Sequence, residues 1–243
     1  SAGRRPGEDG DVMSDLLPWL GGFLKDAVYP RRCADCGSRG AWVCDICRDA
    51  LPLFSPPWCS RCGTPDVLAA CQCARMPPEI AMARSSGLFA GWLRGSILGL
   101  KYHGERDRAG YLGEMLAAAA PAAAHPLLVP VPLHAARERS RGYNQSELIA
   151  RVAADHLGWP CELAVERVRE TRSQVGLGAA ERAANTAGAF TRSEAGRKID
   201  FTLVTPVLVA DVFTPGATQA AAAMPMIAAG AGRVIALTLA REL

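Results

Sequence analysis

The sequence predicts an α/β fold: a parallel sheet flanked by helices and preceded by a small cysteine-rich zinc module. Residues 207–210 and 233–240 are apolar runs, typical of strands that are buried on both faces of a parallel sheet. The alanine-rich residues 220–229 lie between them, as the helix of a crossover unit would. Four short cysteine pairs fall within residues 33–73, and they predict the zinc module.

The amino-terminal residues contain no apolar core of a signal peptide, so we expect no export. Residues 1–13 are polar and glycine-rich, and we expect a disordered extension before a natural start at Met13. Residues 14–29 place leucines at helical spacing, with Ser14 as the cap, and predict a short helix that packs on the protein. A cytoplasmic location is therefore expected.

Eight of the nine cysteines are the predicted metal ligands. They are Cys33, Cys36, Cys44, Cys47, Cys59, Cys62, Cys71 and Cys73. Short pairs of this kind turn two thiolates onto one ion, and two pairs complete the tetrahedral four-sulfur site that suits zinc. We expect two structural zinc ions within a module of residues 14–76. The spacing leaves open whether the pairs combine in order or interleave. Cys161 stands apart and is expected to be a core residue.

Prolines at residues 77–78 mark a linker, and residues 77–243 form the predicted α/β domain. Apolar runs and helical periodicity predict its elements. The expected strands are residues 80–89 and 127–132, and the expected helices are residues 93–102, 108–120 and 145–157, before the final crossover unit. Pro225 lies inside the last predicted helix, at 219–229, and we expect a kink or a shortened helix there.

Two stretches are predicted to bind an anion. After the strand at 207, Asp211 is followed by the small residues Thr214, Gly216, Ala217 and Thr218 at a helix start. Such a turn directs N–H groups and hydroxyls at one point, where the helix dipole also favours a phosphate.

The second stretch contains Arg137, Arg139 and Arg141, followed by Gly142. Crowded like charges of this kind need an anion or a solvated face, and we expect a mobile loop over the site, with Arg137 and Arg141 as phosphate ligands.

Composition excludes some classes of protein. Hydrophobic residues at 49% and charged residues at 21% fit a soluble globular protein. No run approaches the roughly 18 apolar residues of a membrane helix. The net charge of +3 does not by itself imply a nucleic-acid partner.

Residues 207–219 resemble the loop with which phosphoribosyltransferases bind phosphoribosyl pyrophosphate (PRPP). That loop has two acidic residues, two variable ones and then Thr-Thr-Gly-x-Thr. Asp211, Thr214, Gly216 and Thr218 match this pattern. Ala210 replaces the first acid and Pro215 replaces the second threonine.

Further motifs make the resemblance more specific. Residues 129–134 read Val-Pro-Val-Pro-Leu-His, residues 141–145 read Arg-Gly-Tyr-Asn-Gln, and Arg167-x-Arg169 and Glu181-Arg182 follow. Together with the cysteine pairs, this order resembles the ComF/GntX family of competence-associated proteins over about residues 14–243.

The resemblance implies a type I phosphoribosyltransferase-like sheet whose ligand is PRPP, usually with Mg²⁺. Asp211 would orient the ribose, Val131 and its neighbours would approach the pyrophosphate, and residues 174–185 would form a hood that selects the acceptor. It also implies an association with DNA uptake, with single-stranded DNA or the uptake machinery as partners.

The two departures bear on catalysis. Loss of one charged and one neutral hydrogen bond costs roughly 2–4.5 kcal/mol. This corresponds to about 30- to 2000-fold in binding or rate. The expected enzyme is a phosphoribosyltransferase with weakened PRPP binding. The alternatives left open are a catalytically impaired relative that acts as an interaction module in DNA uptake, and a nucleic-acid-binding protein.

Overall fold

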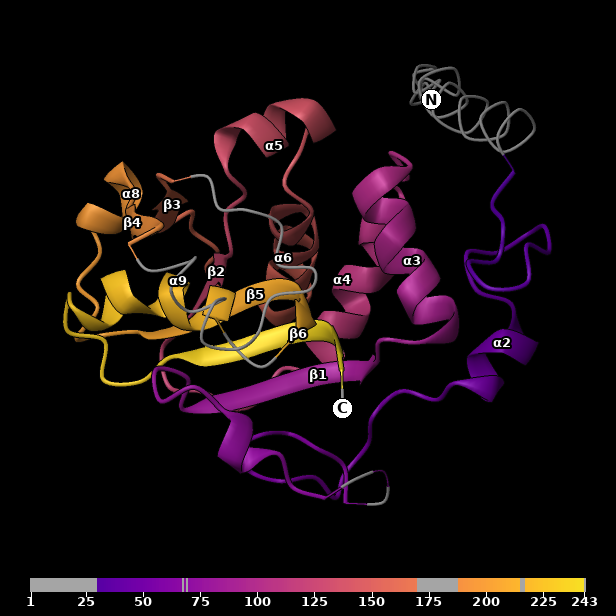
Figure 1. Cartoon of the computed structure of the whole chain (residues 1–243), viewed down its shortest axis with the longest axis horizontal. Coiled ribbons are helices and arrows are strands. Elements are labelled where there is room, and N and C mark those ends of the chain that lie inside the picture. Colours follow the sequence, from indigo (N-terminus) through magenta and orange to yellow (C-terminus); the bar gives the residue numbers. More distant parts are fainter. Residues whose placement is uncertain (1–29, 67, 69, 170–187, 215–216, 243) are drawn as a thin grey trace, which may run out of the picture.

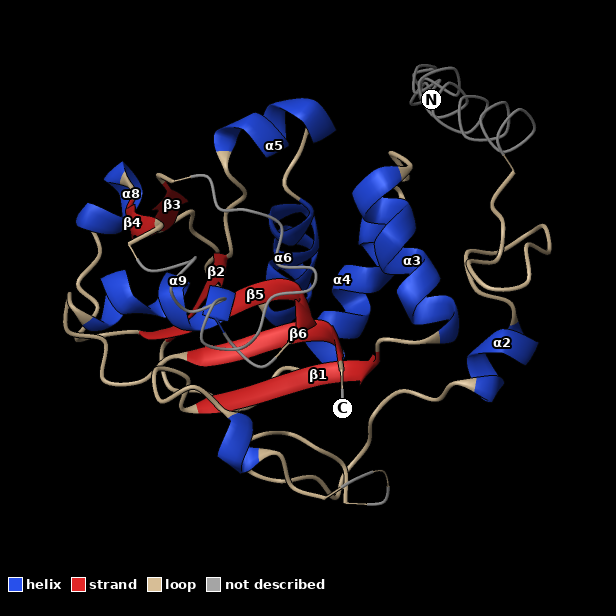
Figure 2. Ribbon diagram, in the orientation of Figure 1, coloured by secondary structure: helices blue, strands red, loops and turns tan. Residues whose placement is uncertain are grey.

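A computed structural model describes residues 30–66, 68, 70–169, 188–214 and 217–242. The predicted extension at 1–13, the predicted helix at 14–29 and the predicted hood at 174–185 lie outside the described residues. The rest of the chain is drawn by sequence order in Figure 1 and by secondary structure in Figure 2.

The centre of the structure is a four-stranded parallel sheet in the order β1-β6-β5-β2 (Figure 1). The strands are β1 (Met82–Leu88), β2 (Pro126–Pro130), β5 (Thr205–Phe213) and β6 (Ile235–Arg241). Val207 lies opposite both Leu128 of β2 and Ile235 of β6. Every residue of β6 is buried, because both faces of the sheet are covered. The predicted parallel α/β sheet is confirmed.

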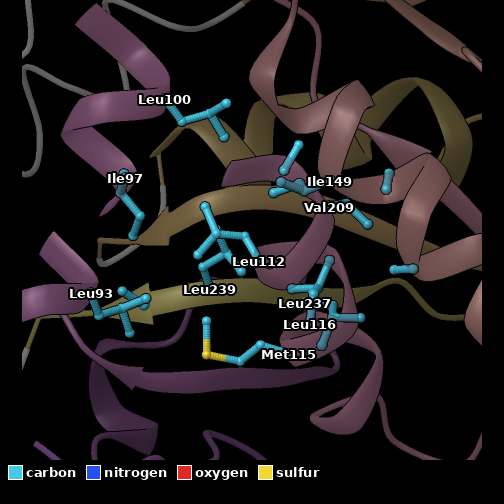
Figure 3. Close-up of a cluster of buried hydrophobic side chains, with 14 of the residues drawn as sticks. Leu93, Ile97, Leu100, Leu112, Met115, Leu116, Ile149, Val209, Leu237 and Leu239 are labelled. Atoms are coloured by element: carbon cyan, nitrogen blue, oxygen red, sulfur yellow. The ribbon is translucent and has the colours of Figure 1, made fainter. Parts of the chain in front are cut away.

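Three helices cover one face of the sheet. They are α3 (Gly91–Tyr102), α4 (Arg108–Ala118) and α6 (Gln145–Leu157), close to their predicted ranges. Leu93 and Ile97 of α3 and Leu112 of α4 pack there against Val209 and Leu237 (Figure 3). This apolar layer positions the ends of α3 and α6 beside β5.

The other face is covered by α9 (Ala217–Ile227) and by a small antiparallel pair, β3 (Val165–Arg167) and β4 (Phe190–Arg192), followed by α8 (Glu194–Arg197). Leu208 and Ala210 of β5 pack on this side, whereas Val207 and Val209 face the first. This alternation follows from the two-residue period of a strand. Pro225 lies within α9, and the helix ends at Ile227, two residues before its predicted end.

The predicted loop over the site is wrong, because residues 135–141 form the helix α5 (Ala135–Arg141). Arginine is a good helix former. The side chain of His134 accepts a hydrogen bond from the amide of Ala136 and caps the start of the helix. Gly142, with φ of 80°, is the left-handed residue that ends the helix, so its role is to terminate α5.

The cysteine-rich segment packs on the α/β domain at two separate places (Figure 1). Its first part, with α2 (Asp45–Ala50), lies against α3, where Trp92 Nε1 donates to the carbonyl of Leu51 at 3.0 Å. Its second part, with the 3₁₀-helix η1 (Cys73–Arg75), lies below β1, where the amide of Ala83 donates to the carbonyl of Arg61 at 2.8 Å. Each part adds cysteines to one of the two hydrophobic cores.

Among the described residues, no helix is both long and apolar enough to cross a membrane.

We expect close helix packing at Gly113 to be sensitive to one added methyl group. A Cβ at Gly113 of α4 would lie 2.4 Å from Cβ of Val152 on α6, so Gly113→Ala should reduce the free energy of unfolding by about 1–3 kcal/mol. Gly110→Ala on the same helix meets no atom within 4 Å and should stabilise by up to about 1 kcal/mol. Urea unfolding of both variants measures the difference, and equal effects would contradict this packing.

Candidate ligand cavity and metal centres

A cavity of about 670 Å³ opens at the carboxyl ends of β2 and β5. In open parallel sheets this edge is where ligands bind. Its walls come from the end of α3, from α5, from the start of α6 and from the start of α9. The residues that line the cavity include Lys101, Val131, Arg137, Arg141, Gln145, Arg167, Ala210, Asp211, Thr214 and Thr218.

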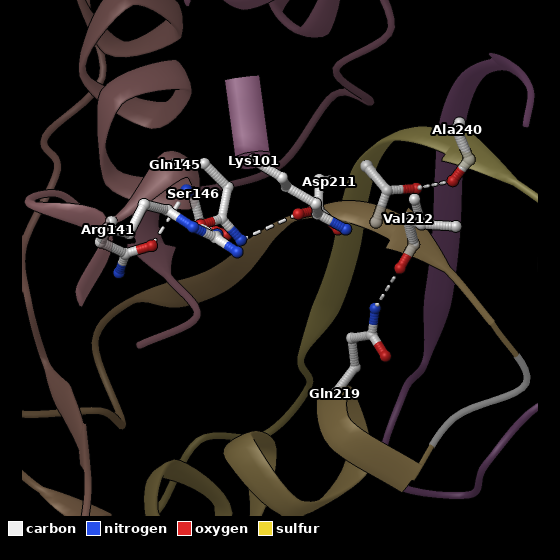
Figure 4. A network of polar contacts seen from close by, with 10 residues as sticks. Lys101, Arg141, Gln145, Ser146, Asp211, Val212, Gln219 and Ala240 are labelled. Atoms are coloured by element: carbon white, nitrogen blue, oxygen red, sulfur yellow. Dashed lines mark hydrogen bonds and ion pairs between the residues drawn. The ribbon is translucent and has the colours of Figure 1, made fainter. Parts of the chain in front are cut away.

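The carboxylate of Asp211 lies at the centre of this edge (Figure 4). Oδ1 is 2.9 Å from Nζ of Lys101, and Oδ2 accepts a hydrogen bond of 2.9 Å from Nε2 of Gln145. Only 12% of the Asp211 side chain is exposed. A charge so far removed from water needs partners of this kind. Asp211 therefore faces the cavity and not the apolar core.

The contacts of Asp211 continue into α5. The Oε1 atom of Gln145 accepts a hydrogen bond from the guanidinium of Arg141, and that guanidinium lies 5.5 Å from the ring centre of Tyr102 (Figure 4 shows the polar contacts). The hydroxyl of Tyr143 donates to the carbonyl of Leu100. These bonds connect α5, α6 and the last turn of α3 around one carboxylate.

Positive side chains outnumber negative ones among the described residues that line the cavity. The cations are Lys101, Arg137, Arg141 and Arg167, and Asp211 is the carboxylate opposed to them among the described lining residues. Arginine binds phosphate through a planar fork of N–H donors, so three arginines, two from α5 and one from β3, favour a phosphorylated ligand.

The described residues of the predicted phosphate loop lie at the same cavity. Thr214 and Thr218 line it, and Thr218 belongs to the first turn of α9, where the positive end of the helix dipole lies. Nε2 of Gln219 donates to the carbonyl of Val212 at 3.0 Å and fixes the start of α9 to the end of β5. Ala217 is the first residue of α9, and Gly216 lies outside the described residues.

Val131 also lines the cavity, directly after β2. Its amide donates to the carbonyl of Val209 at 2.9 Å, and its carbonyl accepts from Nδ2 of Asn144 at 3.2 Å. Val131 therefore holds the wall of the cavity to β5 and to the start of α6. Arg137 and Arg141 lie on α5 above it, on the same cavity.

Sequence reasoning missed Lys101 and the second role of Gln145. Lys101 is one of three lysines in the chain and ends a predicted helix, which is the available signal for it. Gln145 was expected only to help begin a helix. Its Nε2 hydrogen bond to Asp211 depends on the packing of α6 against β5, which no local pattern reveals.

The cysteines gather in chain order into two clusters. Cys33, Cys36, Cys44 and Cys47 form the first, and Cys59, Cys62, Cys71 and Cys73 form the second. A tetrahedral zinc ion at about 2.3 Å from each sulfur sets the sulfurs about 3.8 Å apart. The Sγ atoms of Cys36 and Cys44 are 3.7 Å apart, and those of Cys62 and Cys71 are 3.8 Å apart. Both clusters fit structural zinc, and the in-order combination is the one that forms.

The surroundings of the clusters shift the thiols in both directions, and the thiolate is the form that binds metal. Burial raises the pKa of Cys47, and the hydrogen bond with Cys71 comes first among the causes that raise the pKa of Cys73 to about 12. Burial raises the pKa of Cys62, but hydrogen bonds from the Thr64 side chain and from backbone amides lower it to about 6. Burial likewise raises the pKa of Cys33, while backbone hydrogen bonds, that of Cys44 first, lower it to about 6. Each cluster therefore holds one thiol, Cys33 or Cys62, whose surroundings favour the thiolate, and one, Cys47 or Cys73, whose surroundings favour the thiol.

Buried arginines attach both clusters to the α/β domain. Arg108 of α4, paired with Glu105 at 2.6 Å, donates to the carbonyls of Trp42 and Arg32 beside the first cluster. At the second cluster, Arg84 of β1 donates to the carbonyl of Ser60 at 3.0 Å, and Arg241 of β6 donates to that of Cys62. Arg241 also lies 5.5 Å from the ring centre of Phe213, at the end of β5.

Comparisons with known proteins bear on the cysteine clusters and on the family of the whole chain. A family model described as "Double zinc ribbon domain" matches residues 24–77. Competence protein F of Haemophilus influenzae is 39% identical to the chain over 92 residues, which cover 37% of this chain and 39% of that protein. DNA utilization protein YhgH of Escherichia coli K12 is 30% identical over 220 residues, covering 84% of this chain and 92% of that protein. Its counterpart in Salmonella typhi is 29% identical over 213 residues.

We expect the clusters to bind metal independently. Cys36→Ser removes one ligand of the first cluster and should lower the zinc content from about two ions per chain to about one. Cys161→Ser is the control, because Cys161 lies outside both clusters and should leave two ions bound. Metal analysis of the purified proteins measures the content. Zinc loss in the control, or none in Cys36→Ser, would contradict this arrangement.

Proposed function

Since the chain belongs to the ComF family of competence and DNA utilization proteins, we propose that its cavity binds PRPP and that it acts in DNA uptake. The observation that carries the first part is the cavity itself. It places one partnered carboxylate, a helix start and four cationic side chains at the carboxyl edge of a parallel sheet. The names of the relatives support the second part.

Each part of the ligand has a matching group in this cavity. The pyrophosphate would be bound by Arg137 and Arg141 of α5, which lie above Val131. The terminal phosphate would lie against the start of α9, where Thr218 and the helix dipole favour negative charge. Asp211 would accept a hydrogen bond from a ribose hydroxyl, as a carboxylate among cations can.

Transfer of the phosphoribosyl group is the activity proposed for this cavity. Displacement of pyrophosphate develops positive charge on the ribose, and a carboxylate beside the ring stabilises that charge. Ala210 lines the cavity without a side-chain oxygen, so Asp211 is the carboxylate that acts here. We therefore propose slow transfer, with Asp211 as the catalytic residue. A relative without activity, acting as an interaction module in DNA uptake, is the alternative.

The zinc clusters have a structural part in this proposal. They lie on the outer sides of α3 and β1, and the cavity-lining residues do not include any of their cysteines. Zinc in the first cluster would hold the segment that packs against α3, the helix that carries Lys101. Zinc in the second cluster would hold the segment bound by Arg241 at the end of β6, which lies next to Phe213 of β5.

Removal of the Asp211 charge should weaken PRPP binding. Asp211→Asn keeps the shape of the side chain but loses a charged acceptor, so we expect a dissociation constant about 10- to 100-fold higher by calorimetry. The control is Asp155→Asn on the exposed side of α6, which should bind as the unchanged protein does.

A titration in which the unchanged protein does not bind PRPP would distinguish the impaired relative from a protein without a PRPP site. If the unchanged protein gives no heat with millimolar PRPP, and Ala210→Asp combined with Pro215→Thr restores binding, the protein is an impaired relative. If neither protein binds, the cavity is not a PRPP site.

The DNA part has a separate test. Arg137 and Arg139 are exposed on α5, and contacts of such side chains with phosphates release counterions. We expect the affinity for single-stranded DNA to fall steeply between about 50 and 200 mM salt. Replacement of Arg139 by alanine should reduce the salt dependence by about one contact. A flat response would argue against direct binding of DNA.

A further inference from the structure

The cavity lacks the ligands of a divalent-cation site. Mg²⁺ requires near-octahedral coordination by oxygens, and a protein usually contributes one or two carboxylates beside waters and the phosphates of the substrate. Among the described lining residues the only carboxylate is that of Asp211, and both its oxygens already have partners. Clusters of three or more metal-ligating side chains occur in the described chain only at the cysteines. The Mg²⁺ implied by the family resemblance therefore does not fit these residues.

The position that a cation would take beside Asp211 belongs to Lys101 (Figure 4). Its ammonium group lies 2.9 Å from Oδ1, and a metal ion at the same oxygen would be repelled by it. The neighbouring Ala210 has no carboxylate, so it offers no second place, away from the lysine, where a metal ion could bind.

We propose that Lys101 takes the place of the divalent cation, so that the cavity binds the phosphorylated sugar without Mg²⁺. This inference rests on the proposed PRPP site. Lys101 would neutralise the pyrophosphate together with Arg137 and Arg141, which line the same cavity from α5. Arg167 of β3 also lines the cavity and adds a further positive charge.

The location of Lys101 suits an exchange of partners. It lies in the last turn of α3, where the helix dipole stabilises a cation, and its side chain is 19% exposed. A lysine is a compact charge on a flexible stem, so its ammonium can move from Asp211 to a phosphate as the ligand enters. Asp211 is then free to accept a hydrogen bond from the ribose.

The test is a calorimetric titration of the full chain with PRPP, once with excess Mg²⁺ and once with EDTA at a concentration that leaves the zinc content unchanged. We expect the two dissociation constants to agree within about threefold. Lys101→Met should weaken binding in EDTA at least tenfold, and Mg²⁺ should recover part of the loss. Lys198→Met is the matched control, since Lys198 caps the end of α8, is exposed, pairs with Glu194 and is not a lining residue of the cavity, so it should change neither value.

Two further variants keep the test decisive if Lys101→Met fails to fold. Lys101→Arg retains the charge and should still bind PRPP in EDTA, while Ala210→Asp adds a carboxylate and should make binding depend on Mg²⁺. Binding of the unchanged protein only in the presence of Mg²⁺ would overturn this inference and leave the PRPP site intact. Absence of binding in both buffers would reject the PRPP site and this inference together.

Discussion

The buried carboxylate of Asp211 is the group around which the cavity is arranged. A charge in a largely dehydrated position is tolerated only with close partners, and here these come from two different helices. Lys101 contributes the opposite charge from the end of α3, and Gln145 contributes an amide from the start of α6. Because Asp211 needs both partners, the end of α3 and the start of α6 must lie at the same edge of the sheet.

The sheet makes this meeting possible because it is apolar on both faces. Leu208 and Ala210 face α9 and the β3–β4 pair, whereas Val207 and Val209 face α3, α4 and α6. In the carboxyl half of β5, which is covered in this way, the polar side chain is that of Asp211, close to the strand end. The polar residues of β5 and of the turn after it therefore collect where the cavity opens, and the arginines of α5 close it from above.

The cysteine clusters extend the same domain at two of its sides. Each four-sulfur cluster replaces the core that a short segment cannot build alone. Arg108, Arg84 and Arg241 bind carbonyls of the cysteine-rich segment from within the α/β domain. Because Arg241 also lies beside Phe213, the second cluster is connected by direct contacts to the strand that carries Asp211.

The sequence by itself determined the parallel sheet, most helix ranges and the eight metal ligands, since these depend on local periodicity and spacing. It also indicated Asp211, Thr214 and Thr218, which follow one another along a strand, turn and helix start. Only the tertiary structure decided that the cysteines combine in order, that Arg137 and Arg141 lie on a helix, and that Lys101 pairs with Asp211. These depend on segments that are distant in the chain, and the Lys101–Asp211 pair joins residues 110 positions apart, a separation over which sequence patterns carry no distance information.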